Sequence, residues 1–151
     1  MYSNHPALGA VAAMGDNWRM FTLAYISAAI TKYLDFIGRR NTMNDSQVAE
    51  TAQLILEEYQ RLKFDDIEFF FRNCRLSKYG KLYDINGQVL LDWLHEYDMQ
   101  RWAAEERKAR HDKEEEERRR IAEWEALPQE EKDRQLREIQ EIQDRITKRL
   151  K

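Results

Sequence analysis

The clearest hydrophobic pattern in the chain runs through residues 16–37, where apolar side chains recur every three or four positions. This spacing places them on one face of an α-helix. One stripe contains Leu23, Ile26, Ile30, Leu34 and Ile37, and a second contains Trp18, Phe21, Tyr25, Ala29 and Phe36. A helix that is apolar on two sides is usually central to a bundle. We therefore expect the second stripe to lie in the core, in preference to lining a ligand pocket.

Four shorter helices are predicted around this segment. Small apolar residues indicate a helix over 7–14. Asn44 with Gln47 and Asp65 with Glu68 have the spacing of capping boxes, which predicts helices over 45–62 and 66–76. A broad apolar face over 87–102 indicates a further helix, which we expect to pack on residues 16–37. No segment alternates as a strand would, so the fold class is all-α, with an N-terminal helical bundle over residues 1–102.

Beyond residue 102 the composition changes. The last 54 residues carry 31 of the 53 charged residues of the chain, and opposite charges recur three or four positions apart, as in a solvated single helix. We therefore expect residues 103–151 to form a charged helical arm. Pro128 interrupts this arm and begins a C-terminal amphipathic helix.

The C-terminal helix carries an apolar stripe that could form a seam with another helix. Its members are Leu136, Ile139, Ile142, Ile146 and Leu150, and Gln143 falls within the heptad series. So short a coiled coil is marginal alone. Three arrangements are open: the helix folds back on Ile121 and Trp124, it forms a homo-oligomer, or it docks on a protein partner.

A second candidate surface is a basic and aromatic segment before residue 87. It consists of Arg72, Arg75, Lys78, Tyr79, Lys81 and Tyr83. Cations and aromatic rings can contact phosphates and stack on bases. In the alternative, the tyrosines fold back onto the bundle and the lysines are solvated. The net charge of −3 gives no general support for nucleic-acid binding, so we favour the alternative.

The remaining candidates for chemistry are few. Cys74 is a lone cysteine without a nearby base, and His95 beside Glu96 lacks the spacing of metal ligands. Glu57 and Glu58 are adjacent on a helix and diverge. We expect no cofactor, no metal site and no enzymatic activity. Residues 20–31, the longest uncharged run after the N-terminus, are too few to span a bilayer, so we expect a cytoplasmic protein without a membrane segment.

The loop and the helix after it resemble a motif of small helical proteins encoded by Bacteroidetes bacteria, their phages and mobile elements. The resemblance covers roughly residues 10–100 and rests on residues 79–83, 86–90, Trp93, Tyr97, 14–18 and 57–63. The charged arm departs from it. The resemblance implies a phage or mobile-element context in a bacterial host. It also implies a binding protein, such as a replication accessory that resembles a helicase loader, with no catalytic residues to carry over. The alternative is a self-assembling structural coiled-coil protein.

Overall fold

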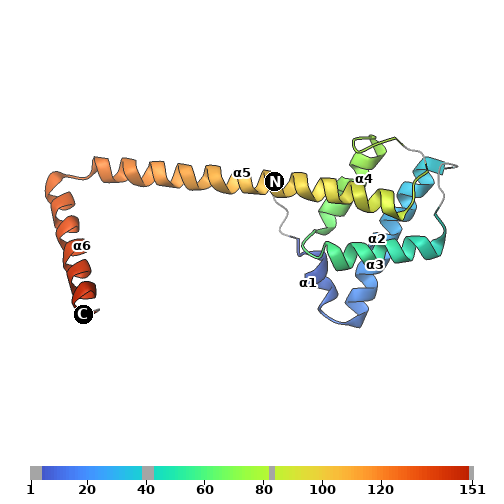
Figure 1. Cartoon of the computed structure of the whole chain (residues 1–151), viewed down its shortest axis with the longest axis horizontal. Coiled ribbons are helices and arrows are strands. Elements are labelled where there is room, and N and C mark those ends of the chain that lie inside the picture. The colour runs from blue at the N-terminus through green and yellow to red at the C-terminus, as the bar shows by residue number, and fades with distance from the viewer. Residues whose placement is uncertain (1–4, 39–42, 82–83, 150–151) are drawn as a thin grey trace. The chain divides into compact units, whose positions relative to one another are not determined.

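The computed structural model describes residues 5–38, 43–81 and 84–149. Helices account for most of these residues, and no strand is formed among them (Figure 1), so the predicted all-α fold is confirmed. The helices are α1 (Leu8–Ala12), α2 (Asp16–Ile37), α3 (Asp45–Glu58), α4 (Phe64–Arg75), α5 (Gly87–Ala126) and α6 (Gln129–Arg149). The chain divides into two compact units, Met1–Arg101 and Trp102–Lys151.

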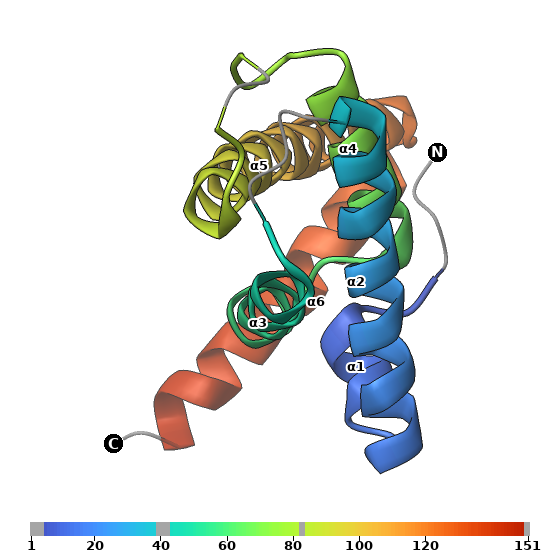
Figure 2. The ribbon, with the colours of Figure 1, turned by 90° about the vertical axis from the view of Figure 1, so that its right-hand side faces the viewer.

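Helix α2 is the centre of the first unit, as its two-sided pattern predicts. It lies against α1, α3 and α4 (Figure 2). Its buried face includes Ile26, Ile30 and Tyr33, none of which is exposed. The prediction for the second stripe is wrong in part, because Trp18, Phe21 and Phe36 are about half exposed. Their side of α2 has too few neighbouring elements to cover them.

The helix boundaries follow local hydrogen bonds. Asn44 and Gln47 form the predicted capping box, with both bonds at 2.9 Å. Helix α3 ends at Glu58, four residues earlier than expected. The backbone carbonyls of Gln60 and Leu62 instead accept hydrogen bonds from the amides of α1, Gly9 and Leu8. The end of the helix therefore opens so that the next residues can hold α1.

The predicted capping box of Asp65 and Glu68 is wrong. Helix α4 begins at Phe64, and the carboxylate of Asp66 accepts a hydrogen bond from the backbone amide of Lys63 at 2.8 Å. Glu68 instead accepts a hydrogen bond from the hydroxyl of Tyr25 in α2 at 2.8 Å. Asp66, the third residue of the helix, thus takes the role that the prediction gave to Glu68, with Lys63 as the N-cap residue.

The first part of α5 is attached to the bundle through α4 and the loop before α4. The hydroxyl of Tyr97 donates to Asp66 at 2.7 Å, and Arg61 pairs with the buried carboxylate of Asp98 at 2.6 Å. Asn86 caps the helix, because its side-chain oxygen accepts a hydrogen bond from the amide of Val89 at 3.0 Å. The closest backbone neighbours of α2 are α1, α3 and α4, while Leu90 and Leu94 of α5 belong to the same hydrophobic core as Ile26 of α2. The expected packing of this segment on α2 stays a prediction.

The same helix continues without interruption to Ala126. Its buried residues, Leu90, Leu94, Tyr97 and Asp98, all lie in the first unit. None of the described residues 102–149 is buried. The second unit therefore has helices but no hydrophobic core of its own.

Helix α2 is also long and apolar enough to cross a membrane by length and composition. The central helix of a water-soluble bundle satisfies the same criterion, and seven residues of α2 are buried against its neighbours. The cellular location of the chain stays a prediction.

Candidate functional site

The apolar stripe of α6 contains four of the exposed large hydrophobic residues described in the second unit. Leu136, Ile139, Ile142 and Ile146 are each 50–54% exposed, and no described residue of α6 is buried. Leu150, the last predicted member of the seam, lies outside the described residues. The stripe is thus presented by a regular helix and is covered by no other described part of the second unit.

Local interactions explain why α6 forms after Pro128. The carbonyl of Pro128 accepts the amides of Glu131 and Lys132 at 3.1 Å, and acidic residues occupy the first turn while Lys148 and Arg149 occupy the last. These charges complement the helix dipole. Hydrogen bonds from Gln135 and Arg134 lower the pKa of Glu131.

The hairpin arrangement in which α6 folds back is not observed. Ile121 is 52% exposed and Trp124 is half-buried, while the four described stripe residues of α6 are each 50–54% exposed, so the stripe does not pack on this end of α5. The ammonium group of Lys132 does reach back across the turn to the carbonyl of Glu125 at 3.0 Å. Of the three arrangements that the sequence leaves open, homo-oligomerisation and docking on a partner remain.

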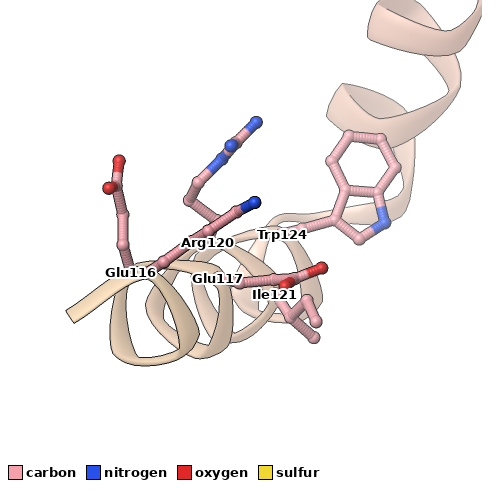
Figure 3. Close-up of a pocket in the computed structure, with 6 residues that line it drawn as sticks. Glu116, Glu117, Arg120, Ile121 and Trp124 are labelled. Atoms are coloured by element: carbon pink, nitrogen blue, oxygen red, sulfur yellow. The ribbon is translucent and has the colours of Figure 1, made fainter. Parts of the chain in front are cut away.

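A hollow of about 610 Å³ lies along the last turns of α5 (Figure 3). Its lining residues all belong to this helix: Lys113, Glu116, Glu117, Arg120, Ile121 and Trp124. A single helix cannot surround a ligand, so this is a surface groove with one apolar end, at Ile121 and Trp124. It extends the apolar surface of the second unit beyond α6.

The basic segment of the first unit is brought together only in part. Arg72, Lys78 and Lys81 are exposed and Arg75 is half-buried, while Tyr83 lies outside the described residues. The ring of Tyr79 stacks on Phe70 with centroids 5.6 Å apart.

Two further contacts fix the loop that carries Tyr79. Its hydroxyl accepts a hydrogen bond from Asn73 at 3.0 Å. A Cβ added at Gly80 would lie only 3.0 Å from the ring of Trp93. Tyr79 is therefore part of the bundle, as the favoured alternative predicts, and its ring is not available to stack on a base.

The lone cysteine is not placed for nucleophilic chemistry. Cys74 is 1% exposed, and burial raises the pKa of its thiol to about 12. A thiol with so high a pKa is almost entirely protonated near neutral pH and is inert. Cys74 is therefore a small residue of the hydrophobic core.

Sequence reasoning missed one group that could hold a metal ion. His111, Asp112 and Glu115 place one ligand atom each within 4.8 Å of one another. The spacing of His111 and Glu115, four residues apart on a helix, could have revealed it. All three side chains are exposed, and charged neighbours four residues apart are common on solvated helices, so the group carries no assignment.

Sequence reasoning also missed an exposed aromatic ridge on the first unit. Trp18 packs edge-on against Phe21 at 6.1 Å, and Phe64 of α4 continues the ridge, at 6.2 Å from Phe21 and 4.8 Å from Tyr25. The aromatic side chains were visible in the sequence. Their exposure was not, because it depends on which elements pack beside them.

A comparison of the chain with family models, with curated proteins and with solved structures finds no match. The resemblance to helical proteins of Bacteroidetes and their phages therefore stays a prediction.

Proposed function

We propose that this chain is a non-enzymatic protein that binds a partner protein through α6. One observation carries the proposal: α6 is amphipathic, yet each of its four described apolar stripe residues is about half exposed and none of its described residues is buried. Such a stripe marks a surface that another helix covers.

The size of the stripe indicates reversible binding. Complete burial of an aliphatic side chain stabilises a complex by about 1.5–3 kcal/mol. Because each of the four stripe side chains is about half exposed in the free chain, binding can gain about half of this free energy at each position. The gross gain is therefore roughly 3–6 kcal/mol, before the cost of association. Ile121 and the groove beside it could add to this gain if the partner reaches α5.

The chemistry of the described residues also supports a binding role over catalysis. The only cysteine is buried and protonated, and the groove on α5 is lined by one helix alone. Neither provides the positioned nucleophile and base that covalent catalysis uses.

We further propose a phage or mobile-element context in a bacterial host, which the resemblance implies. There the chain would act in the cytoplasm as a replication accessory similar to a helicase loader. Arg72, Lys78 and Lys81 are exposed and supply a second contact, to the same partner or to nucleic acid. Because Tyr79 is stacked inside the bundle, this contact would be with phosphates or carboxylates instead of bases.

The test is recovery of partners from the native host with the full chain and with two variants. Ile139→Asp with Ile146→Asp places charges in the stripe. Arg134→Asp with Lys148→Asp places the same residue on the outer face of α6. We expect a protein, either a host protein or a further copy of this chain, that is recovered with the wild type and the outer-face variant but lost with the stripe variant. Identical recovery with all three chains would contradict the proposal.

The nucleic-acid contact has its own test. Lys78→Glu with Lys81→Glu should abolish any binding of the full chain to DNA at low salt, because such binding depends on phosphate neutralisation. Absence of DNA binding by the wild type at low salt would remove this part of the proposal and leave the protein partner.

Self-assembly is the second candidate function. One observation favours it: the positions that flank the stripe of α6 are uncharged over two heptads, and identical helices can therefore pair there without repulsion.

A further inference from the structure

We infer that the partner of α6 is the same helix from further copies of this chain, in a parallel bundle of three or four strands. The inference rests on the proposed function, since it takes α6 as the binding element and names its occupant. Three features of α6 support it: the charges beside the stripe, the glutamine within it, and the branching of its apolar residues.

The first feature is the distribution of charge around the seam. With Leu136 at heptad position a, Ile139 and Ile146 fall at d. The flanking e and g positions from 135 to 147 are occupied by Gln135, Gln140, Ile142 and Thr147. The charged residues of this stretch all fall at b, c and f, on the outer face of α6: Arg137, Glu138, Glu141, Asp144 and Arg145.

Charges at e and g usually determine which helices pair with each other. Uncharged flanks provide no repulsion between identical copies and no charge that would select a foreign helix. The charge pattern therefore fits pairing of α6 with itself.

The second feature is Gln143, which falls at position a between the two apolar d residues. In a parallel, in-register bundle each Gln143 faces the Gln143 of its neighbours, and an amide can both donate and accept a hydrogen bond. In an antiparallel bundle it would face Ile139 or Ile146, which leaves a buried amide without a partner at a cost of about 1–3 kcal/mol. Gln143 therefore selects the parallel orientation.

The third feature sets the number of strands. The apolar a positions of the seam, 136 and 150, are leucine and both d positions are isoleucine. This arrangement favours trimers and tetramers over dimers. Ile142 at g widens the apolar face to three positions in that heptad, and it is 50% exposed. A dimer buries mainly a and d and would leave Ile142 in water, whereas additional strands cover it.

Sedimentation equilibrium of the full chain tests the inference. We expect the mass to rise with concentration from 18.3 kDa to three or four times this value. Ile139→Asp with Ile146→Asp should stay at the monomer mass at every concentration, whereas Arg134→Asp with Lys148→Asp should assemble like the wild type. A wild-type chain that remains monomeric, or that stops at a dimer, would overturn the inference.

Disulfide cross-linking tests the orientation. In a parallel bundle, oxidation should link full chains that carry Leu136→Cys, because position a faces itself there and Gln143 is retained. Glu141→Cys on the outer face is the matched control and should stay unlinked. Cys74 can remain in both variants because it is buried. An assembled chain in which Leu136→Cys does not cross-link would rule out the parallel register.

The two proposals fail in distinguishable ways. A monomeric wild type that still recovers a host protein through its stripe overturns self-assembly and leaves the proposed function standing. A monomeric wild type whose recovered proteins are unaffected by the stripe variant overturns both.

Discussion

Helices α2 and α6 have nearly the same length, 22 and 21 residues, but their apolar residues have opposite surroundings. Seven residues of α2 are buried, against α1, α3 and α4. No described residue of α6 is buried, although its Leu and Ile residues recur with the same helical spacing. The comparison shows that the spacing of apolar residues determines which face of a helix is hydrophobic. Whether that face is buried within the same chain depends on the helices that lie beside it.

The same contrast occurs within a single helix. Up to Arg101, α5 has buried residues and specific partners such as Asp66 and Arg61. Beyond that point it carries exposed ion pairs four residues apart, such as Arg110 with Glu106 and Arg119 with Glu123. Exposed pairs of this kind contribute about 0.3–0.5 kcal/mol each. The second unit is therefore held as helix by local interactions, and under the proposed function a partner supplies its tertiary stability.

Among the substitutions considered, the largest loss of stability in the first unit is expected for the replacement of Phe70. Its side chain is fully buried and contacts the rings of Phe71, Tyr79 and Tyr97. Phe70→Ala should lower the free energy of unfolding of the first unit by about 3–5 kcal/mol, measured by urea denaturation.

The neighbouring Phe69 is 49% exposed and provides the matched control. Phe69→Ala should cost far less than Phe70→Ala, and Ile146→Ala in α6 should leave the unfolding of the first unit unchanged. Equal losses for all three variants would contradict the division between a unit with a core and a unit without one.

A smaller effect is expected at Gly87, where α5 begins against α3. A Cβ at this position would lie 2.5 Å from the hydroxyl oxygen of Thr51, which is 4% exposed and donates to the carbonyl of Gln47 at 2.7 Å. Gly87→Ala should destabilise the first unit by about 1–3 kcal/mol through overpacking. Removal of the hydroxyl in Gly87→Ala with Thr51→Ala should restore part of this loss. A double variant that is less stable than the sum of the single variants would refute the contact.

The mildest perturbation is alkaline pH. All five described tyrosines, Tyr25, Tyr33, Tyr59, Tyr79 and Tyr97, have a raised pKa, with desolvation by burial as the main cause. A group whose pKa is higher in the folded state than in the unfolded state stabilises the folded state. This stabilisation is complete at pH values below the pKa of the unfolded state, which is about 10 for tyrosine. This stabilisation is lost as the pH rises through the folded values.

The first unit should therefore lose stability above about pH 10. The second unit contains no tyrosine, so the ultraviolet absorbance of tyrosinate reports on the remainder of the chain alone. Ionisation of the five tyrosines should coincide with unfolding followed by circular dichroism. Complete ionisation near pH 10 in a folded chain would contradict their burial.

Much of this fold could be predicted from local sequence. The bounds of α2 match the prediction, and Asn44 with Gln47 marks the start of α3, because caps and periodicity are properties of neighbouring residues. The start of α4 could not be predicted, since Asp65 and Asp66 are both able to cap and tertiary contacts favour Asp66. The exposure of Trp18 and Phe21 was also unpredictable, because it depends on elements distant in sequence.

The candidate binding surfaces could also be predicted from the sequence only in part. The stripe of α6 was visible in its heptad spacing, and the structure adds that its described residues are not folded back on Ile121 and Trp124. For the basic segment, the sequence could not decide whether Tyr79 faces solvent or Phe70, because that contact depends on how the loop packs on α4.

Hydrogen–deuterium exchange of the full chain at several concentrations tests the central claim most directly, because amide protection reports the stability of each helix separately. We predict strong protection of α2 and α4 that is independent of concentration. In α6 we predict weak protection in dilute solution that rises as the chain is concentrated, and that stays weak in Ile139→Asp with Ile146→Asp. An α6 that is as strongly protected as α2 at the lowest concentration would contradict the claim that its stability depends on a partner.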